Sequence, residues 1–191
     1  MKQLNDYKSL YRDGSGGGKM GLNDFGALFS EGRNSSGYNQ GTVDAETIIA
    51  NLARDKTSGE IVETIKIVTH SMGGAYGKGY VRALKKYIRS LPKEQQAQIK
   101  ITLVADFDPF FAGSMEADPN IYTQQFNHKN GKGRKSSDKF GWLGNEIQSG
   151  VDYYHEDKKE SAHSISTFFN DISKLKEGSY KWDGDQWILQ K

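Results

Sequence analysis

A serine that follows a short apolar run has the surroundings that nucleophilic chemistry needs. Ser71 comes directly after the β-branched run 64–69, and a helical pattern begins just beyond it. A serine hydroxyl is a poor nucleophile, so it needs a nearby base and a turn that presents its oxygen. A sharp strand-to-helix turn does this, provided that the residues two before and two after are small. Thr69 and Gly73 hold those positions, so Ser71 is predicted to be a nucleophile at a turn that Thr69 strains somewhat.

Two aspartates near the end of a strongly apolar run, 99–107, are candidates for the acid of a catalytic triad. Asp106 and Asp108 are two residues apart, and Pro109 follows. Residues two apart in a strand share a face, so both carboxylates are expected on one side of the sheet. Asp108 is nearer the carboxyl edge and is the predicted acid, which would orient the histidine and stabilise its charged form. Asp106 is the alternative.

The chain offers four histidines as the base. His70 lies inside the turn and is expected to pack there, and His128 is expected on the surface. His155 and His163 both precede the last predicted helix. His163 is preferred because the helix start favours the neutral imidazole that a base requires, and His155 is the alternative.

The elements that must position these residues alternate between strand and helix patterns. Helical spacing of apolar residues predicts three helices, and β-branched or alternating runs predict the strands. The expected strands are 64–69 and 99–107 and, more weakly, 7–11, 25–29 and 121–126. Of the three expected helices, the first begins at Asp44, the second spans 75–91 and the third spans Ser161 to Leu175. The stretch 30–42 is rich in Gly, Ser and Asn and is expected to be a loop.

This alternation predicts an α/β fold, with a parallel sheet flanked by helices on both faces. The end of the chain, with Asp183 and Gly184 between aromatic arms, predicts a C-terminal β-hairpin. We therefore expect one domain over 1–177 and an aromatic hairpin over 178–191 packed on it. A ligand site in such a sheet belongs at the carboxyl ends of the strands, where Ser71 and Asp108 fall.

Two segments resemble a known family. The run IKIVTHSMGGAYGKGY, residues 65–80, resembles the nucleophile elbow of lipases and esterases of the α/β-hydrolase fold. The run ITLVADFDPF, residues 101–110, resembles the following strand of pancreatic-type lipases, whose triad acid stands in an Asp-Pro pair. Together they cover 26 of the 191 residues, about a seventh of the chain. The resemblance implies a minimal α/β-hydrolase core with the triad Ser71, Asp108 and His163 in that chain order.

The resemblance also implies an oxyanion hole made by two backbone N–H groups. One belongs to Met72, the residue after the nucleophile. The glycine-rich segment 13–18 is a loose analogue of the loop that supplies the other, and Gly16 is the residue we assign there. This segment lacks the leading His-Gly of that loop, and a flexible linker explains the same residues.

The activity implied is hydrolysis of carboxylic esters, with a small-molecule or lipid ester as substrate and no cofactor or metal. An amide or a thioester would use the same machinery. The alternative is a non-catalytic interaction module with the same fold, such as the terminal domain of a larger secreted or toxin-like protein. Thr69 in the turn and the missing His-Gly favour that alternative.

Composition excludes other classes of function. The 26 basic and 24 acidic residues are mixed along the chain, so no nucleic-acid footprint is expected. No apolar stretch approaches the ~20 residues of a membrane span, and no integral membrane contact is expected. Cysteine is absent, which excludes thiolate chemistry and does not indicate whether the protein works in an oxidising or a reducing compartment of the cell. No zinc or two-metal ligand spacing and no phosphate-binding glycine motif is present, whereas the acidic loops leave calcium as an alternative.

Overall fold

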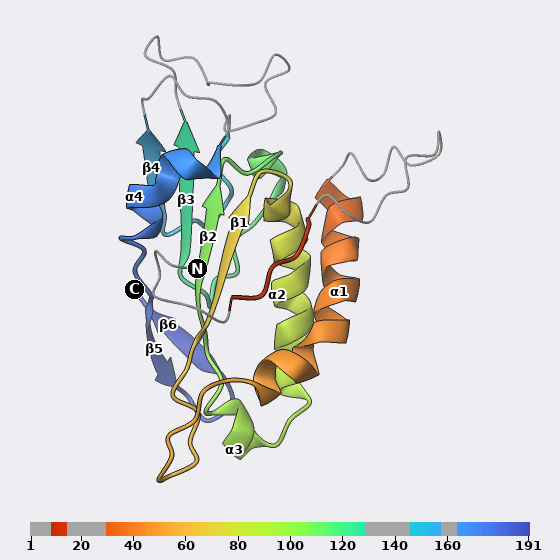
Figure 1. Cartoon of the computed structure of the whole chain (residues 1–191), viewed down its shortest axis with the longest axis vertical. Helices are drawn as coiled ribbons and strands as arrows, with labels where there is room; N and C mark the ends of the chain where they lie inside the picture. The colour runs from red at the N-terminus through yellow and green to blue at the C-terminus, as the bar shows by residue number, and fades with distance from the viewer. Residues whose placement is uncertain (1–8, 15–29, 129–145, 158–163) are drawn as a thin grey trace.

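A computed structural model describes residues 9–14, 30–128, 146–157 and 164–191. In this part of the chain, strands β1 (Ile65–His70), β2 (Ile101–Phe107), β3 (Thr123–His128) and β4 (Tyr153–Asp157) form a parallel sheet in the order β1-β2-β3-β4 (Figure 1). Strands β5 (Ser179–Trp182) and β6 (Trp187–Gln190) pair separately as an antiparallel hairpin. The α/β class, the parallel sheet and the C-terminal hairpin are therefore confirmed.

Helical segments lie on both faces of the sheet. Every residue of β2 is buried, and its alternate side chains face opposite layers, as pleating requires. Phe107 packs with Phe168 and Ile172 of the short segments η4 (Ile165–Phe168, a 3-10 helix) and α4 (Phe169–Ile172). Val104 packs in a separate core with α2 (Gly73–Arg89) on the other face.

The helix α1 (Ser30–Ala50) packs against α2, on the side away from the sheet (Figure 1). The expected loop over 30–42 was wrong, since all of it is helical. Glycines explain why: a Cβ on Gly37 would lie 1.9 Å from the Tyr76 carbonyl oxygen, and one on Gly79 would lie 1.8 Å from that of Asn34. The two backbones touch at these glycines, and packing overrides the weak helix propensity of the segment.

Two strand predictions fail or cannot be compared. Residues 9–11 of the expected strand 7–11 have no regular structure, and the expected strand 25–29 lies outside the described residues. Strand β4, which contains His155, was not predicted. It lies at the edge of the sheet beside β3 and carries several polar residues, so it lacks an apolar run that would mark it.

The last helix is shorter than its pattern predicts. The helix expected over 161–175 is the pair η4 and α4, and its N-cap is Ser164, whose side chain accepts a hydrogen bond from the Ser166 N–H. A short helix α3 (Lys93–Gln96) follows α2 beyond Pro92, and a 3-10 turn η3 (Ala112–Ser114) follows β2. Among the described helices, none is both long and apolar enough to cross a membrane.

The C-terminal hairpin packs at the amino ends of β2 and β3. The Tyr180 hydroxyl accepts a hydrogen bond from the Tyr122 N–H at 2.7 Å and donates one to the Thr102 carbonyl at 3.2 Å. The Lys100 ammonium lies 4.1 Å from the centre of the Trp187 ring. The hairpin therefore lies at the end of the sheet opposite the carboxyl edge (Figure 1).

Candidate functional site

Ser71 occupies a tight turn between β1 and α2. Its φ angle is 57°, in the left-handed region that residues with a Cβ rarely adopt. Three backbone hydrogen bonds hold this conformation. The Ser71 N–H donates to the Phe107 carbonyl at 2.9 Å, and the Ser71 carbonyl accepts from Gly74 and Phe110, each at 3.1 Å. The turn is thus strained locally and stabilised by its surroundings.

Backbone strain is concentrated at the carboxyl edge of the sheet. In the described part of the chain, the non-glycine residues with positive φ are Ser71, Asp108 (43°) and Phe111 (55°). Two directly follow neighbouring strands, and the third precedes η3. Such conformations cost of order 1–3 kcal/mol each and are frequent at functional sites.

Thr69 fits under the turn because the residue of α2 that faces it, Gly77, has no side chain. A Cβ on Gly77 would lie 2.6 Å from the Thr69 methyl group, so α2 makes room at Gly77. The Thr69 hydroxyl donates a hydrogen bond of 2.5 Å to Asp106. The larger residue at the first small position of the motif is therefore accommodated by a glycine in the helix.

Asp106 is fully buried on the α2 side of the sheet. Besides the Thr69 hydroxyl, its carboxylate accepts from the Lys78 ammonium at 2.8 Å and from the Gln148 amide at 2.7 Å. These partners come from β1, α2 and the segment before β4. Asp106 therefore ties together the elements beneath the Ser71 turn.

Asp108 faces a different set of residues, so the expectation that both carboxylates share one side was wrong. The positive φ at Asp108 ends the strand geometry and redirects its side chain. One carboxylate oxygen accepts from the His128 N–H at 2.8 Å, and the other contacts Nδ1 of the same histidine. The structure thus brings Asp108 together with His128.

His128 is buried, with 1% of its surface exposed, so the expectation of a surface position was wrong. Its ring centre lies 4.0 Å from that of Phe168, and Nε2 lies 2.5 Å from the Thr167 hydroxyl. Hydroxyl, imidazole and carboxylate are therefore connected in the order found in a catalytic triad.

The proton positions in this series of hydrogen bonds, Thr167–His128–Asp108, depend on Thr167. Its hydroxyl lies 2.6 Å from the Ser164 carbonyl and has a single proton. This proton can go either to the Ser164 carbonyl or to Nε2 of His128, but not to both.

Of the two histidines predicted as the base, only His155 is among the described residues. His155 lies in β4, with its ring centre 6.1 Å from that of Phe126. His163 lies outside the described residues, but Ser164, the next residue, hydrogen-bonds to Thr167 at the carboxyl edge. Sequence reasoning missed the Asp108–His128 pair. The available signal was that His128 also ends a strand, as Asp108 does.

The predicted oxyanion donors are partly described. Met72 caps α2, and in the described structure its N–H has no hydrogen-bond partner. Gly16 lies outside the described residues. Gly14, earlier in the same glycine-rich segment, packs so closely that its Cβ would lie 2.9 Å from the Gly73 Cα, and its carbonyl accepts from Arg33 at 2.9 Å. The start of this segment therefore lies against the first turn of α2.

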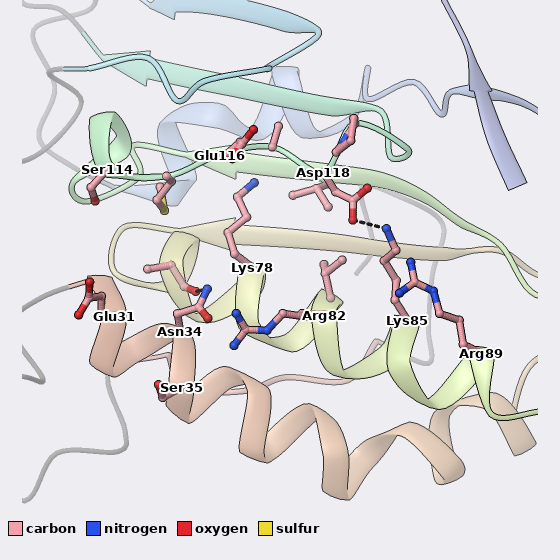
Figure 2. A pocket seen from close by; sticks show the side chains of 16 residues that line it. Glu31, Asn34, Ser35, Lys78, Arg82, Lys85, Arg89, Ser114, Glu116 and Asp118 are labelled. Carbon is pink, nitrogen blue, oxygen red and sulfur yellow. Dashed lines mark hydrogen bonds and ion pairs between the residues drawn. The ribbon is translucent and has the colours of Figure 1, made fainter. Parts of the chain in front are cut away.

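A groove of about 710 Å³ runs along α2, between α1 and the residues 114–119 (Figure 2). The basic residues Lys78, Arg82, Lys85 and Arg89 line it from α2. Lys85 forms an ion pair with Asp118 on the opposite wall. Asn34 fixes the base of the groove, where its amide lies 3.4 Å from the Ala75 carbonyl.

The described residues contain no group of three side chains arranged to hold a metal ion. Comparison with protein-family models, curated protein sequences and solved structures found no match.

Proposed function

We propose that this chain is a serine hydrolase of the α/β-hydrolase type that cleaves carboxylic esters, with Ser71 as nucleophile and Asp108 as the triad acid. The observation that carries the proposal is the left-handed strand-to-helix turn at Ser71, at the same sheet edge as an aspartate already paired with a histidine. A nucleophile elbow requires such a turn.

In the proposed reaction, the Ser71 hydroxyl loses its proton to a histidine and attacks the acyl carbon of the ester. The Met72 N–H donates to the oxygen that becomes negative, and the start of the glycine-rich segment lies close enough to α2 to favour a second donor from that segment. The same histidine then protonates the leaving alcohol. Water, activated by this histidine, releases the acid from Ser71.

His163 is the proposed base. The assignment follows the chain order Ser71, Asp108, His163 that this fold implies, and Asp108 lies at the carboxyl edge, where it accepts a hydrogen bond from the His128 N–H. His128 itself is almost completely buried and is held by Thr167, and among the contacts of the described residues it has no hydrogen bond to Ser71. In this role His128 would fix the Asp108 carboxylate.

Mutation of each histidine tests this assignment. His163→Ala should abolish ester turnover, whereas His128→Ala should retain part of it. In the unmutated protein, kcat/KM should rise with pH through about 6.5, because the base acts in its neutral form. The measurement is hydrolysis of a p-nitrophenyl ester between pH 5 and 9. A reversed ranking of the two variants would make His128 the base.

Covalent labelling tests the nucleophile. A fluorophosphonate probe should label the unmutated chain stoichiometrically and Ser71→Ala not at all, with mass spectrometry locating the adduct. Ser90→Ala, an exposed serine just beyond α2, is the control and should be labelled normally. Labelling that persists in Ser71→Ala would refute Ser71 as the nucleophile.

A non-catalytic interaction module is the second candidate. One observation favours it: Thr69, whose hydroxyl binds Asp106, occupies the first small position of the turn, where a nucleophile elbow has glycine. Absence of labelling in the unmutated, folded chain would support this alternative.

A further inference from the structure

The groove along α2 begins beside the Ser71 turn and has a basic far end. Ala75, in the first turn of α2, lines one end, and Arg89, at the last residue of α2, lines the other. Figure 2 shows Glu31 and Ser114 toward one end and Arg89 at the other, with Glu116, Lys78 and Arg82 between them and Asp118 beside Lys85. Glu31 thus lies at the end of the groove away from Arg89.

Internal ion pairs neutralise two of the four basic residues. Lys78 is bound to the buried Asp106, and Lys85 is bound to Asp118. Among the residues that the structure describes, no acidic side chain forms an ion pair with Arg82 or Arg89. The Arg82 guanidinium carbon lies 5.0 Å above the centre of the Tyr38 ring, which leaves its N–H groups available at the edge.

The arginines are spaced to act on one ligand. In the described structure, neither guanidinium makes a hydrogen bond, and both side chains are exposed to the groove. Seven residues of helix separate them by roughly 10 Å, and both lie on the same helix face. A guanidinium has a planar set of donors that matches the oxygens of a carboxylate or a phosphate.

We infer that Arg82 and Arg89 form a binding site for an oxyanion group, carboxylate or phosphate, of an elongated ligand that lies along α2. This rests on the proposed function only in that the ligand would be an ester with its acyl group at Ser71. The anion binds toward Arg89, because Glu31 repels it from the other end. The preferred substrate is therefore an anionic ester.

Direct binding tests the site without any need for catalysis. Isothermal titration at low ionic strength would use inorganic phosphate and, separately, succinate, which distinguishes phosphate from carboxylate recognition. The double variant R82Q/R89Q should weaken binding of at least one of the two by about tenfold or more, since two charge-assisted interactions are lost. Ser71→Ala should bind as the unmutated chain does.

Lys86→Gln is the matched control, because Lys86 lies on the same helix and carries the same charge but does not line the groove. It should bind within about twofold of the unmutated chain. An equal loss in Lys86→Gln and R82Q/R89Q would overturn the site, since it would indicate a general effect of charge. Failure of the unmutated chain to bind either anion at millimolar concentration would also overturn it.

Kinetics tests the substrate class. The ratio of kcat/KM for an ester with a terminal carboxylate or phosphate to that for a neutral ester of equal length should fall about tenfold in R82Q/R89Q. An unchanged ratio would overturn the assignment of an anionic ester. If no ester is hydrolysed, the proposed function is wrong. The anion-binding measurements would still show whether Arg82 and Arg89 form a binding site.

Discussion

Asp106 and Asp108 have different neighbours although they are only two residues apart. Asp106 binds Thr69, Lys78 and Gln148 on the α2 side, whereas Asp108 binds His128 where β2 ends. The positive φ at Asp108 separates them. A buried carboxylate is stable only when its charge is satisfied, and each aspartate has found its own partners.

Asparagine substitution should separate the roles of the two aspartates. Asp108→Asn should lower kcat by as much as ~10⁴-fold, since an amide no longer holds the histidine in its working tautomer. Asp106→Asn should cost less activity but about 3 kcal/mol of stability, because it leaves the Lys78 ammonium without its counter-charge. Ester turnover and thermal unfolding of both variants provide the measurement. An inactive Asp106→Asn beside an active Asp108→Asn would make Asp106 the acid.

At the scale of elements, the position of α2 depends on glycines. Gly77 lets α2 approach β1 below the Ser71 turn, while Gly79 and Gly37 bring α1 and α2 into backbone contact. The wall of the groove and the start of the turn belong to the same helix, so this packing positions both.

Gly79→Ala tests the close contact of α1 and α2. Its Cβ would lie 1.8 Å from the Asn34 carbonyl oxygen, so the helices must separate. We expect a loss of about 3 kcal/mol of unfolding free energy, measured by urea denaturation, as for strongly overpacked sites. Gly73→Ala is the control, since among the described residues its Cβ would meet only Thr69 Cβ, at 3.7 Å, and its stability should change little. Equal stability of the two variants would contradict the contact.

At the scale of the whole molecule, a buried polar cluster joins the N-terminal segment 9–14 to α1 and α2. The Asp44 carboxylate accepts from Arg12 at 2.7 Å, from Tyr80 at 2.7 Å and from Gln40 at 3.0 Å. The hydrogen bond from Arg12 is the main cause that holds the pKa of Asp44 below its usual value. The Asp44 carboxylate therefore connects the segment 9–14, α1 and α2, which are far apart in the sequence.

Asp44 should make stability depend on pH in a defined direction. Because its pKa is lower in the folded state, its contribution is complete above the unfolded value of about 3.9 and is lost as pH falls through the folded value. Asp44→Asn should therefore unfold at a lower temperature than the unmutated chain at pH 7, and the difference should shrink toward pH 3. Glu46→Gln, exposed on the same helix, is the control and should show a much smaller difference at pH 7. A difference for Asp44→Asn that does not vary with pH would contradict this role.

Local sequence patterns determined the elements that carry the turn. The runs 64–69 and 99–107 are apolar over a few consecutive residues, and the helix after Ser71 repeats its apolar residues with helical spacing, so each is recognisable without its neighbours. The same holds for the hairpin around Gly184. The sequence alone thus predicted β1, α2, β2 and the position of Ser71 between a strand and a helix.

Tertiary contacts decided the rest. The helical state of 30–42 depends on glycines that are useful only against α2, and β4 forms because β3 offers it an edge. The sequence pattern did not predict the partner of Asp108 either. His128 is 20 residues away and is brought beside Asp108 by β3, and the positive φ at Asp108 turns its side chain toward the opposite face from Asp106. Periodicity reports which face of an element is apolar. It carries no information about which polar groups meet where two elements end, and the candidate site is made of such groups.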